Sequence, residues 1–324
     1  MKTTSLTHWG LFDFHVEQGQ LINVTPHTGD TDPSPIGRNL INGNTKCRIE
    51  QPAIRRGFLE KDAGKQRGSD EFVSVSWEEA IDLAAYELDR VRTNYGNSAI
   101  YGGSYGWASA GRFHHAQSQL HRFLGSIGGY TGSVNAYSFA AAEVILPHVI
   151  GHYEKLLKMP SSWPTIIEHG ELMVCFGGLP IRNSQITNGG LGRHVQVEYL
   201  TAARAAGIKF VNVSPARDDT PDFLDASWLA IRPGSDVALM LAIAHEIYIH
   251  DWHDQRFIDK YCVGFTEFVP YLTGEADGVP KTPAWAQAIT GIPAKEISDL
   301  AKKMVVSRTM ISVSWSLSRH EHGE

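Results

Sequence analysis

The sequence predicts an α/β protein with mostly parallel sheets covered by helices, resembling dinucleotide-binding folds, and a small β-rich region at the N-terminus. From residue 171 onward, short apolar strands alternate with helical runs, as in βαβ units. The first 72 residues are instead rich in Gly, Pro, Asn and Thr, with alternating runs such as GLFDFHVE. We therefore expect a β-rich region over 1–72, a helical/αβ domain over 73–165 and a dinucleotide-binding-like domain over 166–324, incomplete at its C-terminus.

The elements before residue 165 follow from capping and stop signals. Ser76 and Glu79 form a capping box and Gly96 a stop, which predicts a helix between them. We expect a short strand over 98–103, and helices over 111–124 and 138–150.

Three strands and three helices are expected in the remaining sequence. The strands are 171–178, 208–215 and 309–315, and the helices 192–207, 235–250 (with Ser235 as N-cap) and 293–307. Ligands of such sheets bind beyond the carboxyl ends of the strands. Four polar loops are expected there: YGGSYGWASAG, GGLPIRNSQ, SPARDDT and SWSLSRHEHGE. Paired glycines in two of them indicate a nucleotide-like ligand, although neither GxGxxG nor a P-loop is present.

The composition disfavours several functions. A net charge of −6 gives no basic surface for nucleic acid. No apolar run approaches the roughly 20 residues of a membrane helix. The N-terminus shows no leader, so we expect a cytoplasmic protein, or a periplasmic one if a leader was removed.

The cysteines and histidines do not form a recognisable metal motif. Cys47, Cys175 and Cys262 lie too far apart for a CxxC pair, and we expect free thiols. His114 and His115 point to different helix faces, and the terminal HEHGE lacks HExxH spacing. We expect no independent histidine metal site.

Two adjacent segments carry a family resemblance. YGGSYGWASAGRFHHAQSQLHRFL and IGGYTGSVNAYSFAAAEVILPHVIG, with HWGLF, RPGSDVALMLAIAH and the final SWSLSR, resemble molybdopterin oxidoreductases of the dimethyl sulfoxide reductase family. The similarity is greatest to the S-/N-oxide reductase branch, which includes dimethyl sulfoxide, trimethylamine N-oxide and biotin sulfoxide reductases. Members are far longer than 324 residues. The resemblance therefore implies an N-terminal portion.

The resemblance implies a bis(molybdopterin guanine dinucleotide) cofactor whose molybdenum is bound by Ser138, in the middle domain. A hard alkoxide suits an oxophilic metal. From the residues alone, Ser138 is instead favoured as a helix N-cap, and one oxygen cannot easily serve both roles.

The resemblance also implies that Tyr105 and Trp107, on either side of the cofactor-lining Gly106, donate hydrogen bonds near the metal. The alternative is that both aromatic residues only pack beside a glycine turn. No cysteine precedes Cys47, so we expect no N-terminal iron–sulfur cluster and an external electron donor.

Further cofactor-binding residues are carried over by position. They are His8, Trp9, Gly177, Gly178, Asn183, Ser214, Arg217, Asp218, Gly234, Ser235, Asp236, Trp315, Ser316 and Arg319. Asp236 is equally explained as a favourable charge in the first turn of a helix. We expect Arg232 to form an ordinary surface ion pair.

The implied function is reduction of a small S-oxide or N-oxide by oxygen-atom transfer to Mo(IV). Related reductases often read Gly-Asp-Tyr-Ser-Thr around the ligand, whereas this chain has Ala136 and Phe139 in place of the acidic and the second hydroxyl residue. Two alternatives stay open: another reaction on the same cofactor, such as sulfide dehydrogenation or hydroxylation, and a truncated, non-catalytic fragment.

Overall fold

The computed structural model describes residues 1–44, 49–62, 64–65, 67–103, 115–136, 138–187 and 189–321. The chain divides into two compact units. The first comprises Met1–Val134 with Gln185–His194, and the second Asn135–Ser184 with Val195–Glu324. The domain boundaries expected near residues 72 and 165 stay predictions.

An antiparallel sheet opens the first unit, in agreement with the β structure expected there. It consists of β1 (Lys2–Thr7), β2 (Gly10–Glu17) and β3 (Gln20–Pro26), in that order. Phe12 of β2 is fully buried and forms its core. The chain continues through η1 (Pro35–Asn44), β4 (Ala53–Arg55), α1 (Arg56–Leu59) and β5 (Phe72–Ser74), and β4 pairs with β5 antiparallel.

A buried pair ties residues 185–194 to this N-terminal region. The Nδ1 atom of His194 lies 2.6 Å from Oδ2 of Asp30, and the His194 backbone N–H donates to Oδ1 at 3.1 Å. The other ring nitrogen lies 3.0 Å from the carbonyl oxygen of Gln185. Both side chains are almost wholly buried, so a segment distant in sequence becomes part of the first unit.

The helix expected after Ser76 is confirmed as α2 (Trp77–Tyr95). Its N-cap hydroxyl accepts from the Glu79 N–H at 3.1 Å. The strand expected over 98–103 is wrong: Asn97–Ala99 form a 3-10 turn, η2, and Tyr101 makes a single bridge to Thr131. One bridge provides no ladder, so no strand forms.

The next two expected helices start later than predicted. They are α3 (Ala116–Ser126) and α4 (Ala140–Ile150). Phe139 occupies the N-cap position of α4 and makes no side-chain cap, so the interpretation of Ser138 as the cap is wrong. Two short helices follow, α5 (Tyr153–Lys158) and α6 (Trp163–His169), neither of them predicted.

The second unit is built on a four-stranded parallel sheet with the order β8–β7–β6–β9. The strands are β6 (Leu172–Phe176), β7 (Lys209–Val213), β8 (Ser227–Leu229) and β9 (Thr309–Val313). Three of them match the expected strands. The three-residue β8 was not predicted, because it is too short to show a periodic pattern.

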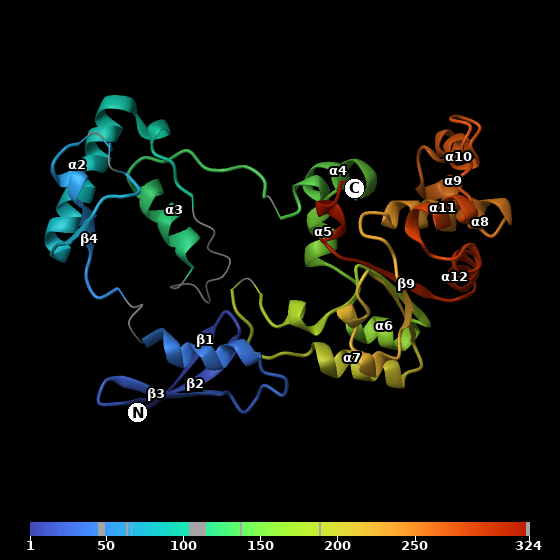
Figure 1. Ribbon diagram of the computed structural model, residues 1–324, viewed down its shortest axis with the longest axis horizontal. Helices are drawn as coiled ribbons and strands as arrows, with labels where there is room; N and C mark the ends of the chain where they lie inside the picture. The colour runs from blue at the N-terminus through green and yellow to red at the C-terminus, as the bar shows by residue number, and fades with distance from the viewer. Residues whose placement is uncertain are drawn as a thin grey trace. The chain divides into compact units, whose positions relative to one another are not determined.

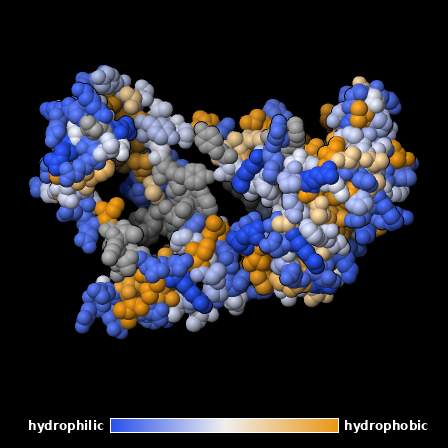
Figure 2. Space-filling model, in the orientation of Figure 1, coloured by the Kyte–Doolittle hydropathy of each residue, from blue (hydrophilic) through white to orange (hydrophobic). Residues whose placement is uncertain are grey.

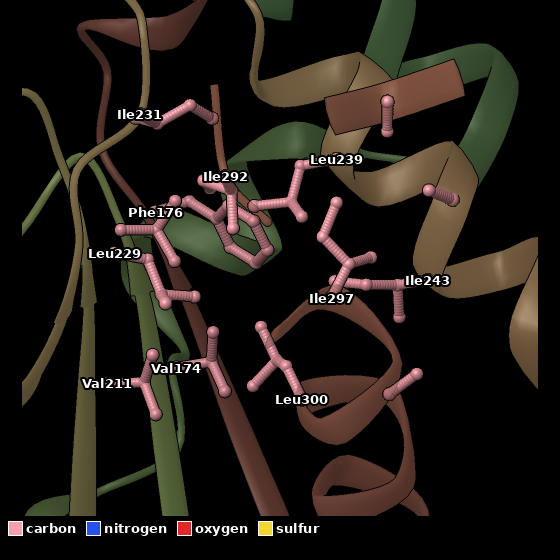
Figure 3. Close-up of a cluster of buried hydrophobic side chains, with 14 of the residues drawn as sticks. Val174, Phe176, Val211, Leu229, Ile231, Leu239, Ile243, Ile292, Ile297 and Leu300 are labelled. Atoms are coloured by element: carbon pink, nitrogen blue, oxygen red, sulfur yellow. The ribbon is translucent and has the colours of Figure 1, made fainter. Parts of the chain in front are cut away.

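Helices cover both faces of this sheet (Figure 1). Alternate strand residues point to opposite faces, so each strand contributes to two cores. Val174 and Val211 face α8 and α12, whereas Met173 and Phe210 face α6 and α7. Figure 3 shows the first of these cores, where strand side chains point toward Leu239 and its helical neighbours. The remaining helices are α7 (Gln196–Ala205), α8 (Asp236–Ile249), α9 (Gln255–Tyr261), α10 (Phe265–Thr273), α11 (Pro283–Thr290) and α12 (Ala294–Val306).

Polar and apolar residues are interspersed over the face shown in Figure 2. In the described ranges of the chain, no helix combines the length and the apolar character needed to cross a bilayer.

We expect Leu239→Ala to lower the free energy of unfolding by about 2–5 kcal/mol, because a fully buried leucine leaves a cavity when truncated. Denaturant titration followed by circular dichroism measures the change. Ile311→Ala, at a side chain 48% exposed on β9, is the control and should cost clearly less. Equal losses for the two variants would contradict the assignment of the core.

We also expect Cys175 to resist alkylation in the folded protein. Burial raises the pKa of its thiol to about 12, so the reactive thiolate is scarce at pH 8. Peptide mapping after iodoacetamide treatment should find the exposed Cys262 modified and Cys175 unmodified until denaturant is added. Modification of both at the same rate would show that β6 is not buried.

Candidate functional site

Three of the four expected polar loops meet at one edge of the parallel sheet. They are residues 177–185, 214–220 and 314–321, which follow β6, β7 and β9. Hydrogen bonds hold the starts of two of these loops to the ends of neighbouring strands, since the Gly177 N–H donates to the Val213 carbonyl at 2.8 Å and the Ser314 N–H to the Phe176 carbonyl at 2.9 Å. Most of the fourth expected loop, residues 104–111, lies outside the described residues, so its place stays a prediction.

The glycine pair at the end of β6 brings these loops into contact. Gly177 and Gly178 have φ of +82° and +77°, a region that favours glycine. A Cβ atom on Gly177 would lie 2.6 Å from the Ser314 Cβ, and one on Gly178 2.5 Å from the Asp219 carbonyl oxygen. The Leu179 N–H also donates to that oxygen, at 2.7 Å. The pair therefore serves loop packing, and its amides are already engaged within the protein.

Asp219 organises the loop after β7. Its carboxylate accepts from the Ser214 hydroxyl and from Nη2 of Arg182, each at 2.5 Å. The sequence predicts a role for Asp218, which is exposed, and not for its neighbour Asp219. The adjacent acidic pair in SPARDDT was the only available signal. Arg217 is also exposed, and Asn183 lies in the short 3-10 turn η4 (Ile181–Ser184).

Two buried polar atoms beside this loop have no hydrogen-bond partner. They are Oδ1 of Asn212 and Oγ1 of Thr220, on side chains of residues that are 1% and 5% exposed. The Asn212 amide group donates to the carbonyls of Ala216 and Arg217, which fixes Oδ1 as the acceptor. Both residues line a cavity of about 350 Å³, together with Asp222, Asp225 and Trp228. Such atoms are costly to bury, so they favour a polar ligand or water there.

The start of α8 brings another acidic group to this unit. Gly234 has φ of +75°, and Ser235 occupies the N-cap position as predicted. Its hydroxyl donates to the Arg232 carbonyl at 2.6 Å, so it does not cap the helix. Asp236 is 7% exposed, and burial raises the pKa of its carboxyl.

Arg232 differs from the expectation of a surface ion pair. Its Nη1 donates to the carbonyls of Ala288 and Ile289, at 2.9 and 3.3 Å. These carbonyls belong to the last turn of α11, so the guanidinium satisfies orphan acceptors at a helix end.

Ser138 lies next to the loop that follows β9. Nε of Arg319 donates to the Ser138 carbonyl at 2.7 Å, and the Phe139 ring packs against Trp315 with centroids 4.3 Å apart. Ser316 turns inward, with its hydroxyl 2.9 Å from that of Ser314. Ser138 thus contacts Arg319, another predicted residue, which lies 181 positions later in the chain.

An apolar cavity of about 600 Å³ lies within the same unit. Side chains of α4, α5, α8 and β9 line it, along with Trp315, Leu317 and Ser318. It can receive an apolar group beside the loop that contacts Ser138.

The remaining predicted residues lie in the first unit or outside the described residues. Tyr105, Gly106 and Trp107 lie outside the described residues, as does Cys47. His8 and Trp9 form the turn between β1 and β2, with their rings 5.6 Å apart at an edge-on angle. They belong to the first unit, whereas the three loops belong largely to the second.

Comparisons with known proteins agree with the resemblance. Residues 48–324 match the family model for molybdopterin oxidoreductases, and residues 5–42 match the model for their N-terminal domain. A dimethyl sulfoxide/trimethylamine N-oxide reductase of Rhodobacter capsulatus is 40% identical over 98% of this chain and 39% of its own length. A biotin sulfoxide reductase of Cereibacter sphaeroides is 40% identical over 94% of this chain and 41% of its own.

The chain thus spans about two fifths of the length of these relatives. Among solved structures, acetylene hydratase from Pelobacter acetylenicus aligns with a TM-score of 0.63 at 20% identity, over 98% of this chain and 41% of that one. This likeness shows a common fold. The family matches go further, and on their evidence the chain belongs to the molybdopterin oxidoreductases, whose name implies a molybdenum–pterin cofactor.

Proposed function

We propose that this chain is part of a molybdenum enzyme that reduces a small S-oxide or N-oxide with electrons from an external donor. The similarity to reductases of dimethyl sulfoxide, trimethylamine N-oxide and biotin sulfoxide supports the substrate class. We propose the cytoplasm, or the periplasm, as its compartment. The single observation that carries the proposal is the position of Ser138, beside the loop of Trp315 and Arg319.

The cofactor proposed is bis(molybdopterin guanine dinucleotide), without an iron–sulfur cluster. Asn212 Oδ1 and Thr220 Oγ1 are acceptors without partners, and guanine and ribose carry the N–H and O–H donors that would satisfy them. The buried Asp236 carboxylate calls for similar donors, since desolvation disfavours its charge. The residues present therefore suit a donor-rich nucleotide. The other cofactor-binding residues that the resemblance implies are proposed to contact the same cofactor.

Ser138 is proposed to bind the metal through its hydroxyl oxygen. Because α4 begins at Ala140 with Phe139 as N-cap, capping does not compete for this position. Tyr105 and Trp107 are proposed to donate hydrogen bonds to the substrate oxygen, each with its single donor. The cofactor supplies the two-electron oxygen-atom transfer, whereas the protein supplies placement and electrostatics.

A second reaction on the same cofactor, such as sulfide dehydrogenation or hydroxylation, is favoured by one contact. Phe139 stands where related reductases carry a hydroxyl residue, and its ring packs on Trp315 at 4.3 Å. This contact places two aromatic rings next to Ser138. A screen of sulfoxides and N-oxides with reduced viologen separates the two reactions. If neither class of compound oxidises the dye, the second reaction is favoured.

We expect Ser138→Ala in the complete enzyme to abolish reductase activity while much of the pterin remains bound. Turnover with reduced viologen and the pterin content of the purified protein measure the two effects. Ser162→Ala is the matched control, because Ser162 is a true N-cap that accepts from the Thr165 N–H on α6. That variant should lose about 1 kcal/mol of stability but keep its activity. Near wild-type activity of Ser138→Ala would refute the ligand role.

We expect Asp236→Asn to have opposite effects on stability and cofactor retention. The folded-state pKa of Asp236 is raised, so its contribution to stability is lost as pH rises through that pKa. At pH 7 the cofactor-free variant should therefore melt at a higher temperature than the parent, with the difference shrinking toward pH 4. Cofactor retention on gel filtration should fall. Asp254→Asn, at the N-cap of α9, is the control and should melt close to the parent, because asparagine caps a helix about as well as aspartate. A lower melting temperature for Asp236→Asn would contradict the analysis.

A further inference from the structure

The backbone on the N-terminal side of Ser138 is held by a glutamate from the helix that follows it. The Ala136 N–H donates to Oε2 of Glu143, at 3.2 Å. Glu143 lies in the first turn of α4, so its side chain reaches back over the start of its own helix. The carboxylate thereby restrains Ala136, two residues before Ser138.

A second donor holds the same carboxylate in place. The Tyr153 hydroxyl, from α5, donates to Oε1 of Glu143 at 3.1 Å. The Tyr153 ring lies 6.4 Å from that of Phe139 and 5.9 Å from that of His152, between centroids. Both carboxylate oxygens thus accept a hydrogen bond, and the side chain has little freedom to leave Ala136.

On the other side of Ser138, Arg319 donates from Nε to the Ser138 carbonyl at 2.7 Å. Arg319 is exposed, so water competes with this contact and it should contribute less than Glu143. The two hydrogen bonds flank Ser138 and come from different parts of the second unit.

Regular structure does not fix the backbone at Asn135 or at Phe139. Asn135 has φ of 66°, and Phe139 has φ −160° and ψ 35°, outside the helical region. No side chain caps α4. A metal ligand must be held within about 0.5 Å of its working position, and here side-chain contacts have to supply that restraint.

We propose that Glu143 is a positioning residue for Ser138, with Tyr153 anchoring it and Arg319 supporting it from the opposite side. This inference rests on the proposed ligand role of Ser138. It adds that the geometry of the ligand is set by a carboxylate that does not itself reach the metal.

The experiment compares Glu143→Ala with Glu143→Gln in the cofactor-loaded enzyme. Alanine removes both hydrogen bonds. Glutamine keeps both, because its oxygen can accept from Ala136 and its amide can donate to the Tyr153 oxygen. Glu296→Ala is the matched control, since Glu296 is also a first-turn glutamate, on α12 of the same unit. Tyr153→Phe removes the anchor alone.

Three readouts are measured: turnover, the paramagnetic resonance spectrum of the half-reduced metal, and amide exchange over residues 131–150. We expect Glu143→Ala to lower kcat by up to about 100-fold, as small displacements of a reacting group can. Its resonance spectrum should shift, and amide exchange at Ala136 should accelerate. Glu143→Gln should restore the spectrum and slow the amide exchange again. For Tyr153→Phe, we expect values between those of Glu143→Ala and the parent. Glu296→Ala should match the parent.

Ser138→Ala separates failure of this inference from failure of the ligand assignment. A spectrum that changes in Ser138→Ala but not in Glu143→Ala overturns the positioning role alone. A spectrum unchanged in Ser138→Ala overturns the ligand role, and the positioning role with it. If Glu143→Ala does not fold, a Tyr153→Phe spectrum identical to that of the parent overturns the proposal.

Discussion

The position of β6 between two parallel neighbours is the constraint on which the rest of the second unit depends. Because β6 pairs with β7 on one side and β9 on the other, residues more than 130 positions apart in sequence lie side by side. The carboxyl ends of parallel strands meet at one edge, so their three following loops gather there. Burial of β6 on both faces holds this order in place.

Much of the polar chemistry at this edge is used to hold the loops together. Ser214, Arg182 and the Asp219 carboxylate satisfy one another, and the amides of Gly177 and Leu179 donate to neighbouring carbonyls. When loops come together, their buried polar groups must form hydrogen bonds with one another, because an unpaired buried polar group costs free energy. Asn212 and Thr220 are exceptions within the described part of the chain, which is why they carry weight in the proposed cofactor site.

Ser138 illustrates how local and long-range structure combine at one residue. Its helix starts two residues later, its own carbonyl accepts from Arg319 in the loop after β9, and Ala136 is held by Glu143 of α4, which Tyr153 of α5 anchors. The apolar contact of Phe139 with Trp315 adds packing to these hydrogen bonds. The backbone around Ser138 thus depends on a small network of hydrogen bonds and ring contacts.

Periodicity and capping act over short distances, so the amino-acid sequence alone predicts the strands β6, β7 and β9 and the helices α2, α7, α8 and α12. The role of Asp219 in place of Asp218, the contacts of Arg232 with a helix end, and the buried pair of His194 and Asp30 emerge only in the folded unit. These outcomes depend on partners far away in the chain. A residue's hydrogen-bonding capacity can be read from its type, whereas the group that satisfies it is set by the packing of the whole unit.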